Sequence, residues 1–179
     1  MTRLFTALEI PSPVAMHLSL LKGGLPGARW IDPENYHVTL RFIGDTDGRT
    51  ADEVANALDR VYRPPFRLTL SGLDCFASGR SPHSLYARVE PTPGLVELQA
   101  EHERILQRLG LPAEGRRYVP HVTIARLRGT SSADAAAWLA AHGDFRVPPF
   151  DVDRFVLYSS RASTGGGPYL IEEAYPLAA

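Results

Sequence analysis

The feature that most constrains this chain is an internal duplication marked by two nearly identical tetrapeptides. His-Val-Thr-Leu begins at His37, and His-Val-Thr-Ile begins at His121, 84 positions further along the chain. A Pro-Pro-Phe segment begins 27 residues after each histidine, at Pro64 and at Pro148. This match in order and spacing is hard to obtain by chance. We therefore predict that one structural unit occurs twice.

Each copy has the pattern strand, helix, strand, helix, strand. Alternating apolar and polar residues end at Glu9 in the first copy and at Glu90 in the second, and a proline-rich break followed by helical spacing comes next in both. Ser12 and Thr92, each followed by proline, fit the N-cap of those helices. The expected copies span roughly residues 2–76 and 84–160, and a further strand is expected at 168–176.

The second helix of each copy also has a start signal. Thr50 with Glu53 fits a capping box, and Ser131 or Ser132 fits the start of the corresponding helix. A duplicated unit tends to pack about a pseudo-two-fold axis. We expect an α+β fold in which residues 1–179 form a single two-lobed domain. Each lobe should be a small, mostly antiparallel sheet with helices outside, and the active-site cleft should lie between the lobes.

Composition excludes several classes of protein. A net charge of −1 argues against a broad electrostatic platform for duplex nucleic acid. The single cysteine, Cys75, excludes an internal disulfide framework and is typical of a reducing compartment. The apolar stretches are too short to span a bilayer. We expect a cytoplasmic monomer without membrane attachment.

The two-residue period of a strand predicts the same side-chain orientation in both tetrapeptides. Alternate side chains of a strand point to the same face, so His37 projects with Thr39 and His121 projects with Thr123. A single His-x-Thr strand is most simply a solvent-facing strand. Two copies at equivalent positions of a duplicated unit instead indicate that two imidazoles and two hydroxyls converge on one site.

These motifs resemble the signature of the 2H phosphoesterase superfamily, two His-x-Thr/Ser-x motifs in a duplicated, two-lobed fold. Within it, the segments RLFTALEIP, LPGARWIDPENYHVTLRFIGD, RRYVPHVTIARLR and DRFVLYSSR are similar to bacterial and archaeal RNA 2′,3′-cyclic phosphodiesterases, also called 2′-5′ RNA ligases. The likeness covers essentially the whole chain. It implies hydrolysis of a 2′,3′-cyclic phosphate at an RNA 3′ end, or on a nucleotide, to a 2′-phosphate. It implies no metal or other cofactor, and reversible 2′-5′ joining of RNA ends is the associated activity.

The four motif residues suit this chemistry. Opening a cyclic phosphate requires one group that removes a proton and another that supplies one, on roughly opposite sides of phosphorus. Histidine titrates near neutrality and can take either role, while Thr39 and Thr123 can donate to the non-bridging oxygens. The resemblance implies that His37 is the proton donor and His121 the proton acceptor. The sequence alone does not assign that order, because the two halves are alike.

Three flanking residues are further candidates for substrate binding. Phe42 and Arg126 each stand five residues after a motif histidine and are candidates to sandwich a terminal base. Strict alternation turns both away from the cleft, so this role requires a twist or bulge at the strand end. Core packing is the alternative for Phe42. Arg126 also matches the family's second motif, which resembles His-x-Thr-x-x-Arg. Arg41 stands four residues after His37, so strict strand alternation places it on the same face, and it is a candidate to steer phosphate. Its counterpart in the second copy, Ala125, has no charge and cannot take this role.

Other functions remain open at this stage. The fold also suits a 2H esterase acting on 2′-5′ oligonucleotides or cyclic ADP-ribose phosphates, or a nucleotide-binding module without turnover. Intact histidines in both motifs argue against the binding module. No other histidine has a second histidine or a carboxylate at the spacing typical of metal ligands, so we expect no metal site.

Overall fold

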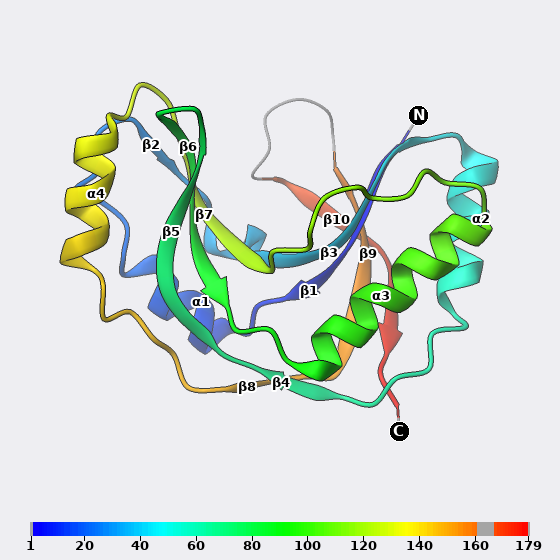
Figure 1. Cartoon of the computed structure of the whole chain (residues 1–179). Helices are drawn as coiled ribbons and strands as arrows, with labels where there is room; N and C mark the ends of the chain where they lie inside the picture. Colours follow the sequence, from blue (N-terminus) through cyan, green and yellow to red (C-terminus); the bar gives the residue numbers. More distant parts are fainter. Residues whose placement is uncertain (1, 161–166, 179) are drawn as a thin grey trace.

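Two four-stranded sheets form the two halves of the α+β fold (Figure 1). The computed structural model describes residues 2–160 and 167–178. Along the chain the elements are β1 (Thr2–Glu9), α1 (Ser12–Ser19), β2 (Ala28–Trp30), the 3-10 helix η1 (Pro33–Asn35), β3 (His37–Thr46), α2 (Gly48–Leu58), β4 (Phe66–Leu68), β5 (Leu70–Ser78), β6 (Ser81–Val89), α3 (Pro93–Arg108), β7 (His121–Leu127), α4 (Ser132–Ala141), β8 (Phe150–Val152), β9 (Arg154–Ser160) and β10 (Tyr169–Pro176).

Each motif strand belongs to a different sheet. The His37 sheet has the order β10-β9-β1-β3, and the His121 sheet has the order β2-β7-β6-β5. Neighbouring strands in both sheets pair antiparallel. The sequence-based prediction of two pseudo-symmetric lobes with mostly antiparallel sheets is therefore confirmed.

The two copies exchange one long strand each. β5 of the first copy pairs with β6 of the second, while β9 of the second copy pairs with β1 of the first. Short strands β4 and β8 pair with each other where the copies cross, at the base of Figure 1. Each lobe is thus built from both copies, so neither copy holds a complete sheet of its own.

The helices cover the outer sides of the two sheets. α2 and α3 lie together on the right of Figure 1 and pack against the His37 sheet, whereas α4 on the left packs against β5 and β6. Because α3 follows β6 of the His121 sheet, it crosses to the opposite lobe just as the exchanged strands do. No helix among the described residues is long and apolar enough to cross a membrane.

Two of the expected helix caps are confirmed and two are wrong. Thr92 caps α3 by accepting from the Leu95 amide, and Ser131 caps α4 by accepting from the Asp134 amide. The cap position of α1 is Pro11, with no side-chain hydrogen bond, so Ser12 is already helical. In α2 the carboxylate of Asp47 accepts from the Thr50 amide at 2.8 Å, so the helix begins a turn earlier than the expected capping box. Thr50 is therefore inside the helix.

The apolar residues of both motifs anchor the motif strands in the core. Val38 and Leu40 are at most 2% exposed, and so are Val122 and Ile124. Burial of such a side chain contributes roughly 1.5–3 kcal/mol, and slipping the register by one residue would expose them all. This packing fixes which face of each strand carries the histidine and threonine.

Candidate active site

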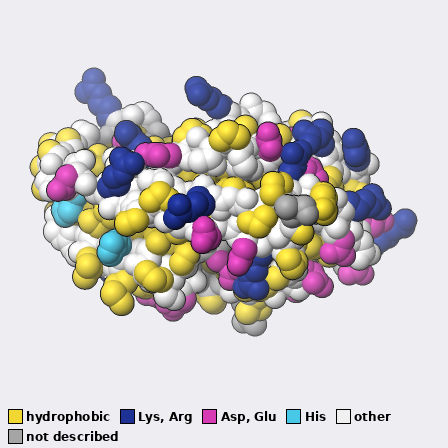
Figure 2. Space-filling model, turned by 90° about the horizontal axis from the view of Figure 1, so that it is seen from below, with side chains coloured by type: hydrophobic (Ala, Val, Ile, Leu, Met, Phe, Trp, Pro, Cys, Tyr) yellow, Lys and Arg dark blue, Asp and Glu magenta, His cyan; other side chains and the backbone are white. Residues whose placement is uncertain are grey.

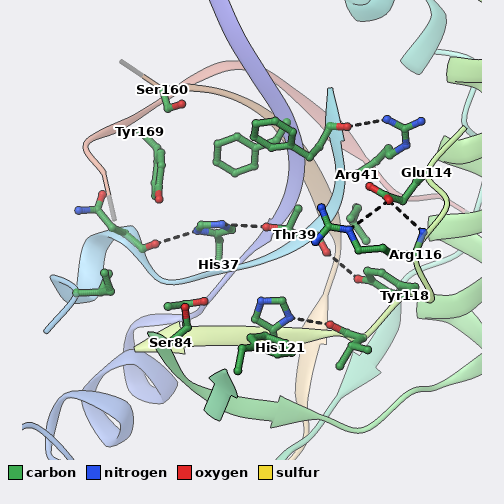
Figure 3. Close-up of a pocket in the computed structure, with 18 of the residues that line it drawn as sticks. His37, Thr39, Arg41, Ser84, Glu114, Arg116, Tyr118, His121, Ser160 and Tyr169 are labelled. Atoms are coloured by element: carbon green, nitrogen blue, oxygen red, sulfur yellow. Dashed lines mark hydrogen bonds and ion pairs between the residues drawn. The ribbon is translucent and has the colours of Figure 1, made fainter. Parts of the chain in front are cut away.

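A cavity of about 670 Å³ lies between the two sheets and is lined by residues of both. His37 and Thr39 enter it from β3, and His121 and Thr123 enter it from β7. Figure 3 shows the two imidazoles facing the same space from opposite strands. The structure thus brings together the four residues that the paired motifs singled out.

Both imidazoles are oriented by the same main-chain contact. Nδ1 of His37 lies 2.9 Å from the carbonyl oxygen of Asn35, and Nδ1 of His121 lies 2.7 Å from that of Val119. A carbonyl oxygen only accepts, so Nδ1 carries the hydrogen in each ring. In the neutral form, Nε2 is then the basic nitrogen. Each histidine therefore presents the same atom to chemistry in the cavity.

The hydroxyl of Thr39 is coupled to the proton state of His37. Its Oγ1 lies 3.1 Å from His37 Nε2. When the ring is neutral, the hydroxyl donates to Nε2. When the ring is protonated, Nε2 becomes a donor and the hydroxyl hydrogen is released. Protonation of His37 therefore makes the Thr39 donor available to an anion.

Aromatic rings hold His37 from three sides. Ring centroids of Phe5, Tyr158 and Tyr169 lie 5.0, 5.9 and 5.0 Å from that of His37. Phe5 comes from β1, whereas Tyr158 comes from the exchanged strand β9. These contacts leave the ring few alternative rotamers.

A matching pair of rings holds His121. Phe76 lies 4.9 Å and Tyr86 5.3 Å from the imidazole centroid, and these two rings stack on each other at 4.2 Å. The duplication relates Tyr86 to Phe5, because each stands four residues before the glutamate that ends its strand pattern. We did not single these aromatic residues out from the sequence, although that equivalence was a signal for them.

The surroundings lower the pKa of both histidines. Burial lowers the pKa of His37 to about 4; the hydrogen bond to Asn35 opposes this, and the charges of His121 and Arg126 add to it. Burial also lowers the pKa of His121, against its hydrogen bond to Val119 and with the charge of Arg126. At neutral pH both rings are therefore neutral. An anion between them would favour the protonated form.

Equivalent bulges place Phe42 and Arg126 in the cavity. The pairing of β3 with β1 skips Leu40, and the pairing of β7 with β6 skips Ile124. Each bulge reverses the alternation after the motif threonine. Phe42, 49% exposed, and Arg126 consequently line the same cavity as the histidines. The bulge that a base-binding role required is therefore present in both copies.

Arg126 retains hydrogen-bonding capacity toward a ligand. Its Nη1 donates to the hydroxyl of Ser84 at 3.0 Å. Its Nε is buried and has no hydrogen-bond partner among the residues that the structure describes. A guanidinium carries five N–H donors, and the bond to Ser84 uses one of them, so Arg126 keeps donors on its Nη atoms for a ligand.

Arg41 lines the cavity, but strict alternation does not describe its surroundings. The bulge at Leu40 turns Arg41 toward the core, where it is 7% exposed. Its Nε donates to Glu103 at 2.5 Å, Nη1 donates to the carbonyl of Phe42 at 2.7 Å, and Nη2 contacts the carbonyl of Pro112. The Arg41 guanidinium in turn lowers the pKa of Glu103 to about 2. Arg41 lines the cavity, but its N–H donors are used in hydrogen bonds within the protein.

Tyr118 links the two motif regions directly. Its hydroxyl donates to the carbonyl oxygen of Thr39 at 2.8 Å, as Figure 3 shows. Tyr118 was not among the residues predicted to form the site. No spacing rule could have found this contact, since it joins β3 to the segment that precedes β7.

No metal centre is evident in the described parts of the chain. Among residues 2–160 and 167–178, no group of three or more His, Cys, Asp or Glu side chains gathers to hold an ion. The expectation that the site works without a metal remains a prediction.

Comparison with known proteins gives consistent matches along the chain. A family model described as the 2′-5′ RNA ligase superfamily matches residues 17–164. An RNA 2′,3′-cyclic phosphodiesterase of Thermotoga maritima is 33% identical over 178 residues, covering 94% of this chain and 92% of its own length. Another, of Aeropyrum pernix, is 32% identical over 153 residues, covering 84% and 86%. The crystal structure of E. coli LigT complexed with 3′-AMP has a TM-score of 0.75 at 22% identity, covers 99% of both chains, and shows the shared fold.

Two duplicated lobes with a histidine and a threonine from each at one cavity define a two-histidine phosphoesterase. With the family match over most of its length, the chain belongs to the 2′-5′ RNA ligase superfamily.

Proposed function

We propose that this protein hydrolyses 2′,3′-cyclic phosphate at RNA 3′ ends to 2′-phosphomonoesters. The observation that carries this proposal is the pair of imidazoles, each with Nε2 free of the main chain, on opposite sides of one cavity. Relatives named RNA 2′,3′-cyclic phosphodiesterase support the choice of substrate.

The proposed reaction moves one proton on each side of phosphorus. Water attacks the phosphorus, and Nε2 of His121 accepts its proton. The bond from phosphorus to the 3′-oxygen breaks, and Nε2–H of His37 protonates that oxygen. The phosphate stays on the 2′-oxygen, and solvent exchange restores both rings. General acid–base catalysis of this kind contributes roughly 10²–10⁴-fold per participating group.

The two threonines are proposed to hold the charge that develops on the phosphate. Thr39 donates to one non-bridging oxygen from the His37 sheet, and Thr123 donates from the His121 sheet. Because the Thr39 hydroxyl bonds to neutral His37, the active form is one in which His37 is protonated and Thr39 is released. An anionic substrate favours this state by raising the pKa of the ring that faces it.

The terminal base is proposed to lie between Phe42 and Arg126. Both line the cavity, and Phe42 is supported from behind by Phe5, with centroids 6.5 Å apart and planes inclined by 19°. A flat apolar ring and a planar cation together fit either face of a base without selecting its identity. Arg41 is left out of substrate binding, since Glu103 and two carbonyls occupy its donors.

The same proton movements accommodate strand joining. If an RNA 5′-hydroxyl replaces water, His121 accepts its proton and His37 protonates the 3′-oxygen. The product is then a 2′-5′ linkage, and reversal of the steps cleaves it. We propose this joining as a secondary activity of the same site.

A substrate panel tests the proposed function. Purified protein with EDTA should convert adenosine 2′,3′-cyclic phosphate and RNA with a cyclic end to 2′-phosphates, identified by chromatography against 3′-phosphate standards. Adenosine 3′,5′-cyclic phosphate should remain intact. Preferential cleavage of 2′-5′ oligonucleotides or of a cyclic ADP-ribose phosphate would favour another 2H esterase, and binding without turnover would favour the non-catalytic module.

A further inference from the structure

The cavity carries far more positive charge than the rest of the molecule. Five arginines and one glutamate line it, namely Arg3, Arg41, Arg116, Arg117, Arg126 and Glu114. The net charge of the whole chain is −1, and on the face drawn in Figure 2 basic and acidic side chains are interspersed. The excess of arginine in the cavity therefore requires a local explanation.

Most of these arginines have a protein partner. Arg41 forms an ion pair with Glu103. Arg3 Nε lies 3.4 Å from Asp45 Oδ1, and Arg116 Nε lies 3.8 Å from Glu114 Oε1. Arg126 bonds to Ser84 near the two histidines. Arg117 is exposed and has no hydrogen bond or ion pair with any described residue. It is the cation most available to an anionic ligand.

The segment that carries Arg117 is fixed at both ends. The carboxylate of Glu103 accepts from the Glu114 amide at 2.9 Å while it also holds Arg41. On the other side, Tyr118 is bonded to the carbonyl of Thr39. Arg117 therefore projects from a held segment, which lowers the entropy cost of binding a ligand.

This basic segment has no equivalent in the other copy. Residues 31–36, which precede His37, contain no arginine, whereas Arg116 and Arg117 precede His121. In Figure 3, Arg116 reaches from this segment toward Thr39. The segments that precede the two motifs thus differ in charge, and Arg3, which lines the cavity from β1, is paired with Asp45. A charge on one of the two segments suits a chain that leaves the site in one direction.

We propose that Arg117, assisted by Arg116, binds the phosphate that joins the terminal nucleotide to its upstream neighbour, and so selects oligonucleotide ends over free cyclic mononucleotides. This inference rests on the proposed function. The motif residues already serve the single charge of the terminal phosphate. Arg117, which has no partner among the described residues, is therefore left to bind a second anion. The cavity volume of about 670 Å³ lies near the middle of the usual range for ligand pockets, about 300–1,000 Å³.

Kinetics on two substrates test this inference. The wild-type protein should show a higher kcat/KM for a cyclic-phosphate dinucleotide than for adenosine 2′,3′-cyclic phosphate. Arg117→Gln should reduce the dinucleotide value by about tenfold, as for one charge-assisted hydrogen bond, and leave the mononucleotide value unchanged. The slope of log kcat/KM against log salt for the dinucleotide should flatten by about 0.7. Arg108→Gln, an exposed arginine of α3 outside the cavity lining, is the matched control and should change neither value.

A neutral linkage separates charge from shape. With the wild-type protein, a dinucleotide whose upstream phosphate is replaced by a neutral methylphosphonate should lose its higher kcat/KM relative to the mononucleotide. Arg117→Gln should not lower kcat/KM for this neutral dinucleotide any further. Equal wild-type activity on both substrates would overturn the inference while leaving the proposed function intact. So would an Arg117→Gln effect that is the same for both substrates. Absence of turnover on either substrate would instead contradict the proposed function, and titration of 2′-AMP against a dinucleotide 2′-phosphate then tests Arg117 by affinity alone.

Discussion

The hydroxyl of Tyr118 donates to the carbonyl oxygen of Thr39 at 2.8 Å, across the space between the two sheets. Tyr118 stands three residues before His121, and Thr39 stands two residues after His37. One hydrogen bond therefore joins the approach to one motif to the backbone of the other. We expect this contact, together with the core, to help set the separation of the two imidazoles.

Removal of the Tyr118 hydroxyl should loosen the site. We expect Tyr118→Phe to lower the free energy of unfolding by about 1 kcal/mol and to reduce turnover, because the ring stays and one buried hydrogen bond is lost. Tyr36→Phe is the matched control, since the Tyr36 hydroxyl is buried with no partner among the described residues. Denaturant unfolding and steady-state kinetics check both variants. Similar losses in the two would show that the Thr39 contact has no special role.

Ligand binding should take up a proton. Burial lowers the pKa of His37 to about 4, and a phosphate anion beside the ring raises it. Ligand binding then takes up protons at any pH between the pKa of His37 without ligand and its pKa in the complex. Affinity therefore increases as pH falls through this range. Calorimetric titration of 2′-AMP near pH 6 in buffers of different ionisation enthalpy measures the uptake. Identical heats in all buffers would mean that both rings stay neutral when the ligand binds.

Acid should destabilise the fold through its buried histidines. Burial lowers the pKa of His102 to about 4, as it does for His37, and His102 is fully buried against Phe155 at 4.5 Å. The unfolded chain, where histidine titrates near 6.5, therefore binds more protons than the native state between about pH 6.5 and pH 4. Stability should fall over that range by up to about 3 kcal/mol for each ring.

Replacement of His102 isolates its share of this acid sensitivity. His102→Leu removes a titrating group whose Nε2 has no partner among the described residues, so unfolding midpoints should depend less on pH than in wild type. His17→Leu is a suitable control, because His17 is exposed on α1. An unchanged pH dependence in His102→Leu would contradict the assignment.

The two threonines should matter about equally for turnover. Replacing either by valine keeps the shape of the strand and removes one donor to the phosphate. We expect Thr39→Val and Thr123→Val each to cost about 2–4 kcal/mol, mainly in kcat, and to agree within about tenfold. Steady-state kinetics on a cyclic mononucleotide check this. A large effect from only one threonine would indicate that phosphate is held from one side.

The convergence of His37, Thr39, His121 and Thr123 on one cavity was predictable from the sequence because it depends on local rules. The duplication relates the two motifs, and the period of a strand puts each threonine on the face of its histidine. The same rule did not predict the burial of Arg41, since a bulge depends on the partner strand and reverses the alternation.

Long-range features were not predictable in this way. Spacing within each copy gives no information about which strand pairs with which, so the exchange of β5 and β9 could not be inferred. The contact from Tyr118 to Thr39 also depends on how the lobes pack. The aromatic residues beside the histidines lie between these cases, because the equivalence of Phe5 and Tyr86 is visible in the sequence but their contacts are not.

A double-mutant cycle on His37 and His121 tests the shared site most directly. With a cyclic mononucleotide as substrate, His37→Ala and His121→Ala should each lower kcat/KM by about 10²–10⁴-fold. The double variant should be little worse than either single variant, because the two rings act on one phosphate as a unit. Near-wild-type activity in either single variant, or losses that simply multiply in the double variant, would contradict the two-histidine mechanism.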